Sequence, residues 1–239
     1  MGYNPEQFSG FYTNNNLGFD LKLVQRGYTQ FKKYFRGISC LELGPATGYM
    51  TKNLVTDFQK VTVVEGSRTL LEQIPNYPNI VKHNTLFEEF ETNDFYDTII
   101  LNHVLEHIEN PVALLKRIKK WMNPNAILIV GVPNSRSFHR LAAVKMGLLK
   151  MENELNERDK ELGHYRVYDM QLLRKHVKSA GYKIIGEGGI FLKFLSNNQI
   201  EKFLNTEVVD AYFELGNDFK ENSAEIFVVL EKLKNKYKK

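Results

Sequence analysis

Apolar runs alternate along this chain with segments whose apolar residues recur at helical spacing. Short, continuously apolar runs indicate buried strands, and amphipathic segments indicate helices. The expected strands cover residues 38–44, 60–66, 96–104 and 126–134, with a weaker candidate at 79–85. The helices expected after them cover residues 47–58, 67–74 and 110–122. This β-α-β-α order predicts an α/β fold whose parallel sheet is covered by helices on both faces.

The second half of the chain interrupts this rhythm. Residues 135–168 are polar and mostly helical, and they follow the end of an expected strand. Ligands of such folds bind beyond the carboxyl ends of the strands, so this insertion is expected to form a lid over the ligand. Asp169 and Gly181 bound the next helix as cap residues. Two further strands are expected, at residues 182–190 and 224–233.

The composition is that of a folded globular protein. Apolar residues make up 43% of the 239 residues and charged residues 25%, which argues against disorder. No stretch approaches the roughly 18 apolar residues that a membrane span needs. Residues 1–10 lack the basic-then-apolar order of a signal peptide. We therefore expect a cytoplasmic protein with a single domain over residues 1–239, in which residues 1–36 form a helical cap.

The single cysteine argues against catalysis by a cysteine nucleophile, and the net charge argues against nucleic-acid binding. Cys40 is the only cysteine and lies inside an expected strand, so we interpret it as a packing residue rather than a nucleophile. The net charge is +4, and subtracting the five lysines of the C-terminal tail leaves the body at −1. Such a body lacks the basic stripe expected for nucleic acid.

The segment CLELGPATGYM, residues 40–50, leaves the first strand through a corner of small residues. Gly44 and Gly48 lie where the backbone of such a sheet comes closest to a ligand, and glycine leaves free the space that a Cβ would fill. The spacing differs from the dinucleotide-binding G-x-G-x-x-G, and no Gly-Lys-Ser/Thr of a P-loop follows. The ligand is therefore not expected to be held by phosphates.

Glu65 ends the second strand, 21 residues after Gly44 and at the same edge of the sheet. A carboxylate at this position accepts hydrogen bonds from both hydroxyls of a ribose. Together the two features favour a nucleoside without a diphosphate. Each also has a plainer interpretation, because a glycine turn is often only tight packing and a strand-end Glu is often only solvated.

Taken together, these motifs resemble those of the class I S-adenosylmethionine-dependent methyltransferases. LELGPATG resembles the family's E/D-x-G-x-G-x-G loop with Ala46 at the middle glycine, and VVEGS resembles its ribose-binding strand end. NHVLEHIENP, ILIVGVPN and GHYRVYDMQLLRKHVKSAGYKIIG are similar to segments of the branch that includes ubiquinone-biosynthesis methyltransferases. The resemblance implies a doubly wound, mostly parallel, seven-stranded Rossmann-like sheet with a helical lid insertion and an antiparallel C-terminal strand.

The resemblance also implies a site for S-adenosyl-L-methionine. The backbone of Gly44 and Ala46 is expected against the methionine part, with Glu42 ordering the loop or approaching the ammonium group. Leu86 stands where many members carry an Asp that holds the adenine, so that contact is either lost or supplied by Thr85. The expected cofactor-binding residues are Glu42, Gly44, Ala46, Gly48, Glu65, Leu86, Phe87, Asn102 and His103.

Methyl transfer from a sulfonium needs a near-attack geometry and, for a hydroxyl acceptor, a base. Histidine is a natural candidate because its ordinary pKa lies near neutrality. We predict His103 and His164 as catalytic residues. His107 is expected either to contact the substrate or only to begin the next helix. No metal is expected, because Glu106 and His107 have no second ligand pair at a suitable spacing.

The expected lid carries cationic and aromatic polar groups, which suit a polar acceptor. The predicted substrate-binding residues are His107, His139, Tyr165, Arg166 and Tyr168. The alternative is that these side chains only tie the lid to the core. Tyr12 and Phe19 in the N-terminal segment are weaker candidates for covering the cofactor.

The sequence thus predicts a methyltransferase acting on an oxygen or nitrogen of a small, polar and possibly sugar-like metabolite. Neither a nucleic-acid partner nor a membrane span is expected, and a homodimer is a possible assembly. Three rivals stay open. A nucleic-acid methyltransferase usually shows an Asp/Asn-Pro-Pro-aromatic run where this chain has NHVLEH. A catalytically silent nucleoside-binding module would bind the cofactor without an acceptor, and the missing middle glycine disfavours a nicotinamide dehydrogenase.

Overall fold

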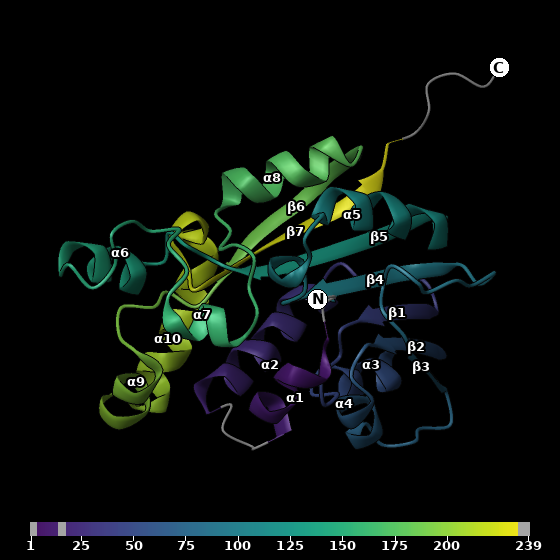
Figure 1. Ribbon diagram of the computed structural model, residues 1–239, viewed down its shortest axis with the longest axis horizontal. Helices are drawn as coiled ribbons and strands as arrows, with labels where there is room; N and C mark the ends of the chain where they lie inside the picture. The colour runs from purple at the N-terminus through teal and green to yellow at the C-terminus, as the bar shows by residue number, and fades with distance from the viewer. Residues whose placement is uncertain (1–3, 14–17, 234–239) are drawn as a thin grey trace.

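A seven-stranded sheet forms the centre of the computed structural model, which describes residues 4–13 and 18–233 (Figure 1). The strand order is β3-β2-β1-β4-β5-β7-β6. The strands are β1 Ser39–Leu43, β2 Lys60–Glu65, β3 Ile80–Asn84, β4 Tyr96–Asn102, β5 Met122–Pro133, β6 Tyr182–Ile190 and β7 Glu225–Lys232. Strands β1 to β5 pair in parallel, and β7 runs antiparallel to both β5 and β6. This topology confirms the predicted fold class.

Ten α-helices of the described residues surround the sheet. They are α1 Glu6–Thr13, α2 Phe19–Lys32, α3 Thr51–Asp57, α4 Arg68–Gln73, α5 Pro111–Ile118, α6 Phe138–Lys145, α7 Glu157–Glu161, α8 Met170–Ser179, α9 Asn197–Phe203 and α10 Thr206–Asp218. Asp169 is the N-cap of α8, because its side chain accepts the backbone N–H of Leu172 at 2.7 Å. None of the described helices has the length and apolarity that crossing a bilayer requires.

The predicted segments map closely onto these elements. The expected lid, 135–168, contains α6 and α7, and the expected N-terminal cap contains α1 and α2. Residues 1–3 and 14–17 of that cap, and four of the five tail lysines, lie outside the described residues. Strand β5 begins at Met122 rather than at 126, because Met122 pairs with Tyr96 beyond an irregularity in the β4–β5 ladder.

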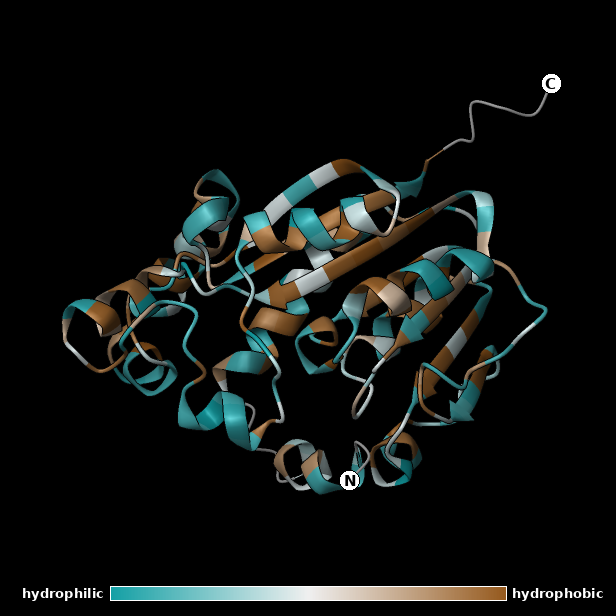
Figure 2. Cartoon of the chain, turned by 45° about the horizontal axis from the view of Figure 1, so that its top comes forward, coloured by the Kyte–Doolittle hydropathy of each residue, from teal (hydrophilic) through white to brown (hydrophobic). Residues whose placement is uncertain are grey.

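Two hydrophobic clusters pack on the two faces of the sheet. One contains Leu41 and Leu43 together with the apolar faces of α5 and α8. The other contains Cys40 with residues of α2, α3, α4, α9 and α10. Neighbouring residues of β1 thus enter opposite clusters, as the two-residue period of a strand requires. The central strands are predominantly hydrophobic (Figure 2), and Cys40 is completely buried, which agrees with its predicted packing role.

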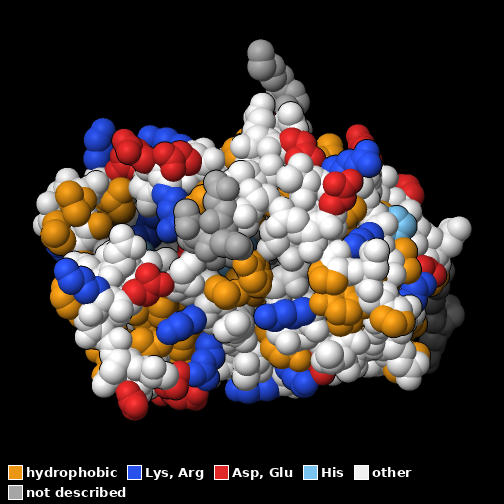
Figure 3. Space-filling view, turned by 90° about the horizontal axis from the view of Figure 1, so that it is seen from below, with side chains coloured by type: hydrophobic (Ala, Val, Ile, Leu, Met, Phe, Trp, Pro, Cys, Tyr) orange, Lys and Arg blue, Asp and Glu red, His pale blue; other side chains and the backbone are white. Residues whose placement is uncertain are grey.

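The carboxyl ends of the five parallel strands meet along one edge of the sheet. This edge gathers the loop after β1, Glu65 at the end of β2, and Asn102 at the end of β4. Strand β7 runs the other way, so its first residue, Glu225, pairs with Pro133 at the end of β5 and joins the same edge. On the face seen in Figure 3, the described Lys and Arg side chains are interspersed with Asp and Glu.

Candidate functional site

A cavity of about 650 Å³ opens at this edge of the sheet. Its volume lies in the range typical of small-molecule sites. The loop after β1, the ends of β2 and β4, helix α1 and the lid all contribute to its walls. The predicted site residues that line it are Glu42, Gly44, Ala46, Glu65, Leu86, Phe87, Asn102, His103, His107, His139, His164 and Tyr165. The cofactor half and the acceptor half of the predicted site therefore face one cavity.

The corner after β1 has the left-handed backbone that its small residues suggested. Gly44 has a φ of 71°, and a Cβ there would lie 2.6 Å from Cγ2 of Val104. Ala46 has a φ of 48°, a conformation that costs an L-residue about 1–2 kcal/mol. Gly48 does not line the cavity, and its Cβ would instead meet Ile74 at 3.1 Å. We therefore correct the role of Gly48 from ligand clearance to packing.

Glu65 fixes this corner from the neighbouring strand. One carboxylate oxygen accepts the backbone N–H of Ala46 at 3.1 Å, and the other accepts that of Ser67 at 2.9 Å. Burial raises the pKa of the Glu65 carboxyl, and these two donors partly offset the effect. Each oxygen keeps lone-pair capacity, since a carboxylate accepts about four hydrogen bonds in all. The side chain lines the cavity, as binding of a ribose would require.

Glu42 is a second buried carboxyl group on the same wall. It accepts a 2.6 Å hydrogen bond from Thr51 Oγ1 at the start of α3. Burial raises its pKa to about 7, and the Thr51 hydrogen bond opposes that shift. Glu42 can therefore change charge near neutral pH, and it ties the loop to α3.

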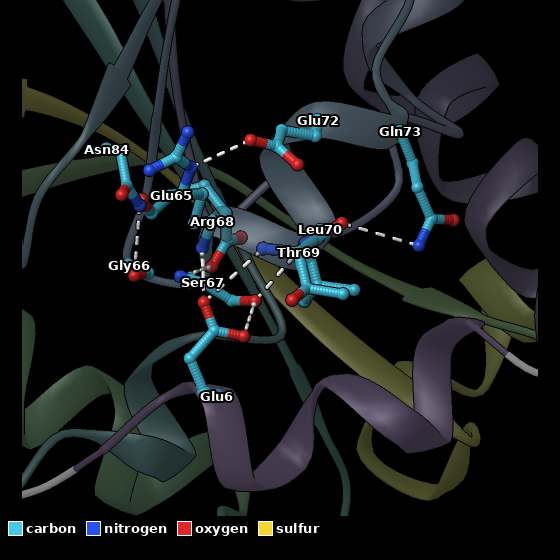
Figure 4. A network of polar contacts seen from close by, with 10 residues as sticks. All are labelled: Glu6, Glu65, Gly66, Ser67, Arg68, Thr69, Leu70, Glu72, Gln73 and Asn84. Atoms are coloured by element: carbon cyan, nitrogen blue, oxygen red, sulfur yellow. Dashed lines mark hydrogen bonds and ion pairs between the residues drawn. The ribbon is translucent and has the colours of Figure 1, made fainter.

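Helix α1 closes the cavity on the side of Glu65. Glu6 accepts hydrogen bonds from Ser67 Oγ at 2.9 Å and from the backbone N–H of Arg68 at 2.6 Å, at the N-terminus of α4 (Figure 4). Tyr12, which was predicted to cover the cofactor, lines the cavity. Phe19 does not, because it is buried against Phe191 at a ring distance of 4.8 Å.

His103 lies at the end of β4 between two acidic side chains. Its Nε2 is 3.0 Å from Glu225 Oε1, and its Nδ1 is 3.5 Å from Glu106 Oε1. Burial alone would lower the pKa of His103, but these carboxylates outweigh it and hold the pKa well above its usual range. The two carboxylates therefore favour the protonated form of His103. Protonation would favour a positioning role for His103 over a role as a base. The catalytic role of His103 stays a prediction.

The other histidines of the cavity are neutral or enclosed. Burial lowers the pKa of His107 to about 4 and that of His139 to about 3. The side chain of His164 is 6% exposed, and its ring packs edge to face on His107 with centroids 4.6 Å apart. One potential metal-ligand atom from each of Glu106, His107 and His164 lies within 4.8 Å of the others. The lid thus supplies a third potential ligand that the spacing along the chain did not reveal.

Two predicted substrate contacts lie outside the cavity. Arg166 donates to the carbonyl oxygens of Leu105 at 3.1 Å and Glu109 at 2.9 Å, and also to that of Ile108. Tyr168 is completely buried and its hydroxyl lies 3.1 Å from His176 Nδ1. Both side chains tie the lid segment to the core, which corrects their predicted roles.

Some cavity residues were missed by the sequence reasoning. Glu225 and Lys193 come from the last third of the chain, and Phe8 and Phe11 come from α1. The one signal for Glu225 was an acid at the start of an apolar antiparallel strand. Thr85, the suggested substitute adenine contact, is not part of the lining.

The cavity has two chemically distinct halves. Next to the glycine corner, Glu65 offers a carboxylate and Leu86 and Phe87 offer apolar contact, which suits a nucleoside. Toward the lid, histidines and carboxyl groups offer polar contacts. The arrangement can hold a nucleoside beside a smaller polar molecule.

Comparison with known proteins gives a family match over most of the chain. Residues 20–187 match a family model described as a methyltransferase domain. A malonyl-[acyl-carrier protein] O-methyltransferase of Halalkalibacterium halodurans is 23% identical over 125 residues, which cover 46% of each chain. A ubiquinone biosynthesis O-methyltransferase of Rickettsia akari is 24% identical over 117 residues, which cover 47% of each. The chain thus spans just under half the length of these curated relatives.

Solved structures resemble almost the whole chain. The N-methyltransferase NodS of Bradyrhizobium japonicum, in complex with S-adenosyl-L-homocysteine, has a TM-score of 0.63 and 13% identity, covering 97% of this chain and 100% of its own. A possible histamine N-methyltransferase of Thermotoga maritima has a TM-score of 0.64 and 15% identity, covering 95% and 99%. At these identities the likeness establishes the shared fold.

Proposed function

Because this chain belongs to the methyltransferase domain family, we propose that it transfers a methyl group from S-adenosyl-L-methionine to an oxygen or nitrogen of a small polar metabolite. The observation that carries the proposal is the pairing of the left-handed corner at Gly44 and Ala46 with the Glu65 carboxylate on one cavity wall. Glycine and alanine leave room for the ligand, and the carboxylate has lone pairs left for two ribose hydroxyls.

We assign the parts of the cofactor along this wall. The ribose lies at Glu65, the adenine lies between the apolar side chains of Leu86 and Phe87, and the methionine part follows the corner toward Glu42 and Asn102. Oδ1 of Asn102 is buried and has no hydrogen-bond partner among the described residues. It can therefore accept from the ammonium group of the methionine part.

Methyl transfer requires mainly that the protein hold the cofactor and the acceptor in the right position. The methyl carbon leaves the sulfonium sulfur in line with the attack of an acceptor lone pair, and the sulfur keeps the electron pair of the broken bond as a thioether. The lid and α1 line the cavity around this encounter. His103, held between Glu225 and Glu106, lines the acceptor half of the cavity and orients the acceptor.

The named relatives favour oxygen or nitrogen as the accepting atom without choosing between them. The curated relatives quoted above are O-methyltransferases, and the structural neighbour NodS is an N-methyltransferase. A sugar-like acceptor, a homodimer and a cytoplasmic location remain predictions from the sequence.

The proposal is tested with S-adenosyl-L-methionine that carries an isotopically labelled methyl group. The purified chain is incubated with metabolite extracts, and labelled products are separated and identified by mass spectrometry. A labelled small molecule that depends on the protein supports the proposal. Cofactor binding with no labelled product from any extract would instead favour the silent nucleoside-binding module, and labelled nucleic acid would favour the nucleic-acid enzyme.

A further inference from the structure

Glu106, His107 and His164 bring three metal-ligating side chains together in the acceptor half of the cavity. Glu106 and His107 lie in the short 3-10 turn Leu105–His107 after β4, whereas His164 comes from the lid. A potential ligand atom of each lies within 4.8 Å of the others, and all three side chains line the cavity. Two segments far apart in the sequence thus supply one group of ligands.

Glu106 is left without hydrogen bonds in this group. The residue is 1% exposed, and neither carboxylate oxygen has a hydrogen-bond partner among the described residues. Nδ1 of His103 lies 3.5 Å from one of these oxygens, which is a loose contact. Nδ1 of His107 is also buried without such a partner. Burying a carboxylate costs free energy unless the carboxylate is paired and hydrogen-bonded. A cation bound between Glu106 and His107 would satisfy these lone pairs.

The surrounding residues hold the group in place. Asp159 Oδ1 lies 3.2 Å from Nδ1 of His164, which leaves Nε2 of that ring available as a ligand. Asp159 is itself fixed by Arg140 at 3.1 Å and by the backbone N–H of Asn156 at 3.0 Å. A carboxylate behind a histidine is the usual way in which proteins orient a histidine that binds metal.

The backbone also fixes the separation of the two segments. The N–H of Tyr165 donates to the carbonyl oxygen of Glu106 at 2.8 Å. Arg166 donates to carbonyl oxygens on both sides of that residue, at Leu105 and Glu109. These bonds tie the residues next to His164 directly to the turn that carries Glu106 and His107. The three ligands therefore belong to one rigid connection between lid and core.

We propose that Glu106, His107 and His164 bind a divalent transition-metal ion in the acceptor half of the cavity. Two imidazoles and one carboxylate suit zinc, manganese or iron better than magnesium or calcium, which prefer oxygen ligands. Three protein ligands leave coordination positions open, which is typical of metal sites that meet a substrate. Because the three side chains line the cavity, an acceptor in the cavity could reach such a position.

The role of the metal rests on the proposed function and narrows the acceptor to a molecule with a hydroxyl group. The ion would bind the hydroxyl oxygen and lower the pKa of that hydroxyl group, and the proton released would pass to water. The oxygen lone pair then forms the C–O bond to the methyl group while the C–S bond breaks. The sulfur keeps that bonding pair, which yields S-adenosyl-L-homocysteine and the methyl ether.

The test measures metal binding by the full chain without any acceptor. Protein stripped with a chelator is titrated calorimetrically with MnCl2 and, separately, with MgCl2, and bound Mn2+ is followed by electron paramagnetic resonance. Glu106→Gln and His164→Ala are compared with His139→Ala, which removes another buried histidine of the same cavity. Thermal unfolding and binding of S-adenosyl-L-homocysteine check that each variant is folded.

The wild type is expected to bind one Mn2+ and to bind Mg2+ at least tenfold more weakly. Glu106→Gln and His164→Ala should each weaken Mn2+ binding at least tenfold, with little change in His139→Ala and in S-adenosyl-L-homocysteine binding. Absence of stoichiometric Mn2+ binding to the wild type, or equal loss in all three variants, overturns the site. Mn2+ binding together with full methyl transfer by the stripped enzyme overturns the role in catalysis and leaves the proposed function standing.

Discussion

Replacing Glu65 by alanine should weaken binding of the cofactor more than any other single change on the nucleoside wall. The carboxylate holds the corner through Ala46 and Ser67 and has two acceptor positions left for the ribose. A hydrogen bond to a charged group contributes about 1.5–3 kcal/mol net. Two bonds at the lower limit give about 3 kcal/mol, which corresponds to a roughly 150-fold higher Kd.

The assay is isothermal titration of the purified variant with S-adenosyl-L-homocysteine. Glu65→Gln keeps one acceptor oxygen, so its Kd should lie between those of the wild type and Glu65→Ala. Glu89→Ala removes an exposed glutamate outside the cavity and serves as the control. If folded Glu65→Ala binds within threefold of the wild type, Glu65 does not hold the ribose and the assignment of this wall is wrong.

Three further changes test neighbouring features. Gly44→Ala should lower the melting temperature and the affinity for S-adenosyl-L-homocysteine, because the new Cβ would meet Val104 at 2.6 Å. The control is Gly147→Ala, because Gly147 has a similar φ of 73° with nothing within 4 Å, so this variant should lose stability only through backbone strain. Equal effects in both variants would remove the steric explanation. Burial raises the pKa of Glu42 from 4.5 to about 7, so the native state holds a proton that the unfolded state has lost, and the free energy of unfolding falls by up to about 3 kcal/mol as pH rises from about 4.5 to 7. Denaturant titrations over this pH range should show a weaker pH dependence of the unfolding free energy in Glu42→Gln. An unchanged pH dependence would contradict the assignment. Glu6→Ala should raise the dissociation rate of S-adenosyl-L-homocysteine several-fold in stopped-flow measurements, because α1 loses its hydrogen bonds to the start of α4. Gln7→Ala, on the exposed side of α1, should leave this rate unchanged. Equal dissociation rates in Glu6→Ala and the wild type would show that α1 does not retain the ligand.

The sequence predicted the sheet well because its signals are local. Strands β1, β2, β4 and β5 are mostly apolar runs whose central residues are buried on both faces, whereas the edge strand β3, the weaker candidate, is only partly buried. The corner at Gly44 and the strand end at Glu65 were found for the same reason. A strand's carboxyl end is visible in the sequence, and all such ends of a parallel sheet meet at one edge.

The polar half of the cavity depends on contacts between distant segments, which the sequence alone does not reveal. Glu225 reaches His103 only because β7 runs antiparallel and begins where β5 ends. The same contact raises the pKa of His103, an effect that its sequence neighbours do not indicate. His164 meets His107 through the fold of the lid. Arg166 was expected in the pocket because a cation in a lid often binds an anion, yet backbone carbonyls take up its donors.

The central claim is that the edge beside Glu65 holds S-adenosyl-L-methionine, and calorimetry tests it most directly. The folded protein is titrated with S-adenosyl-L-methionine, with S-adenosyl-L-homocysteine and with NAD. We predict one binding site for each of the first two compounds and no heat for NAD. No heat for either adenosyl compound, or equally tight binding of NAD, would contradict the account.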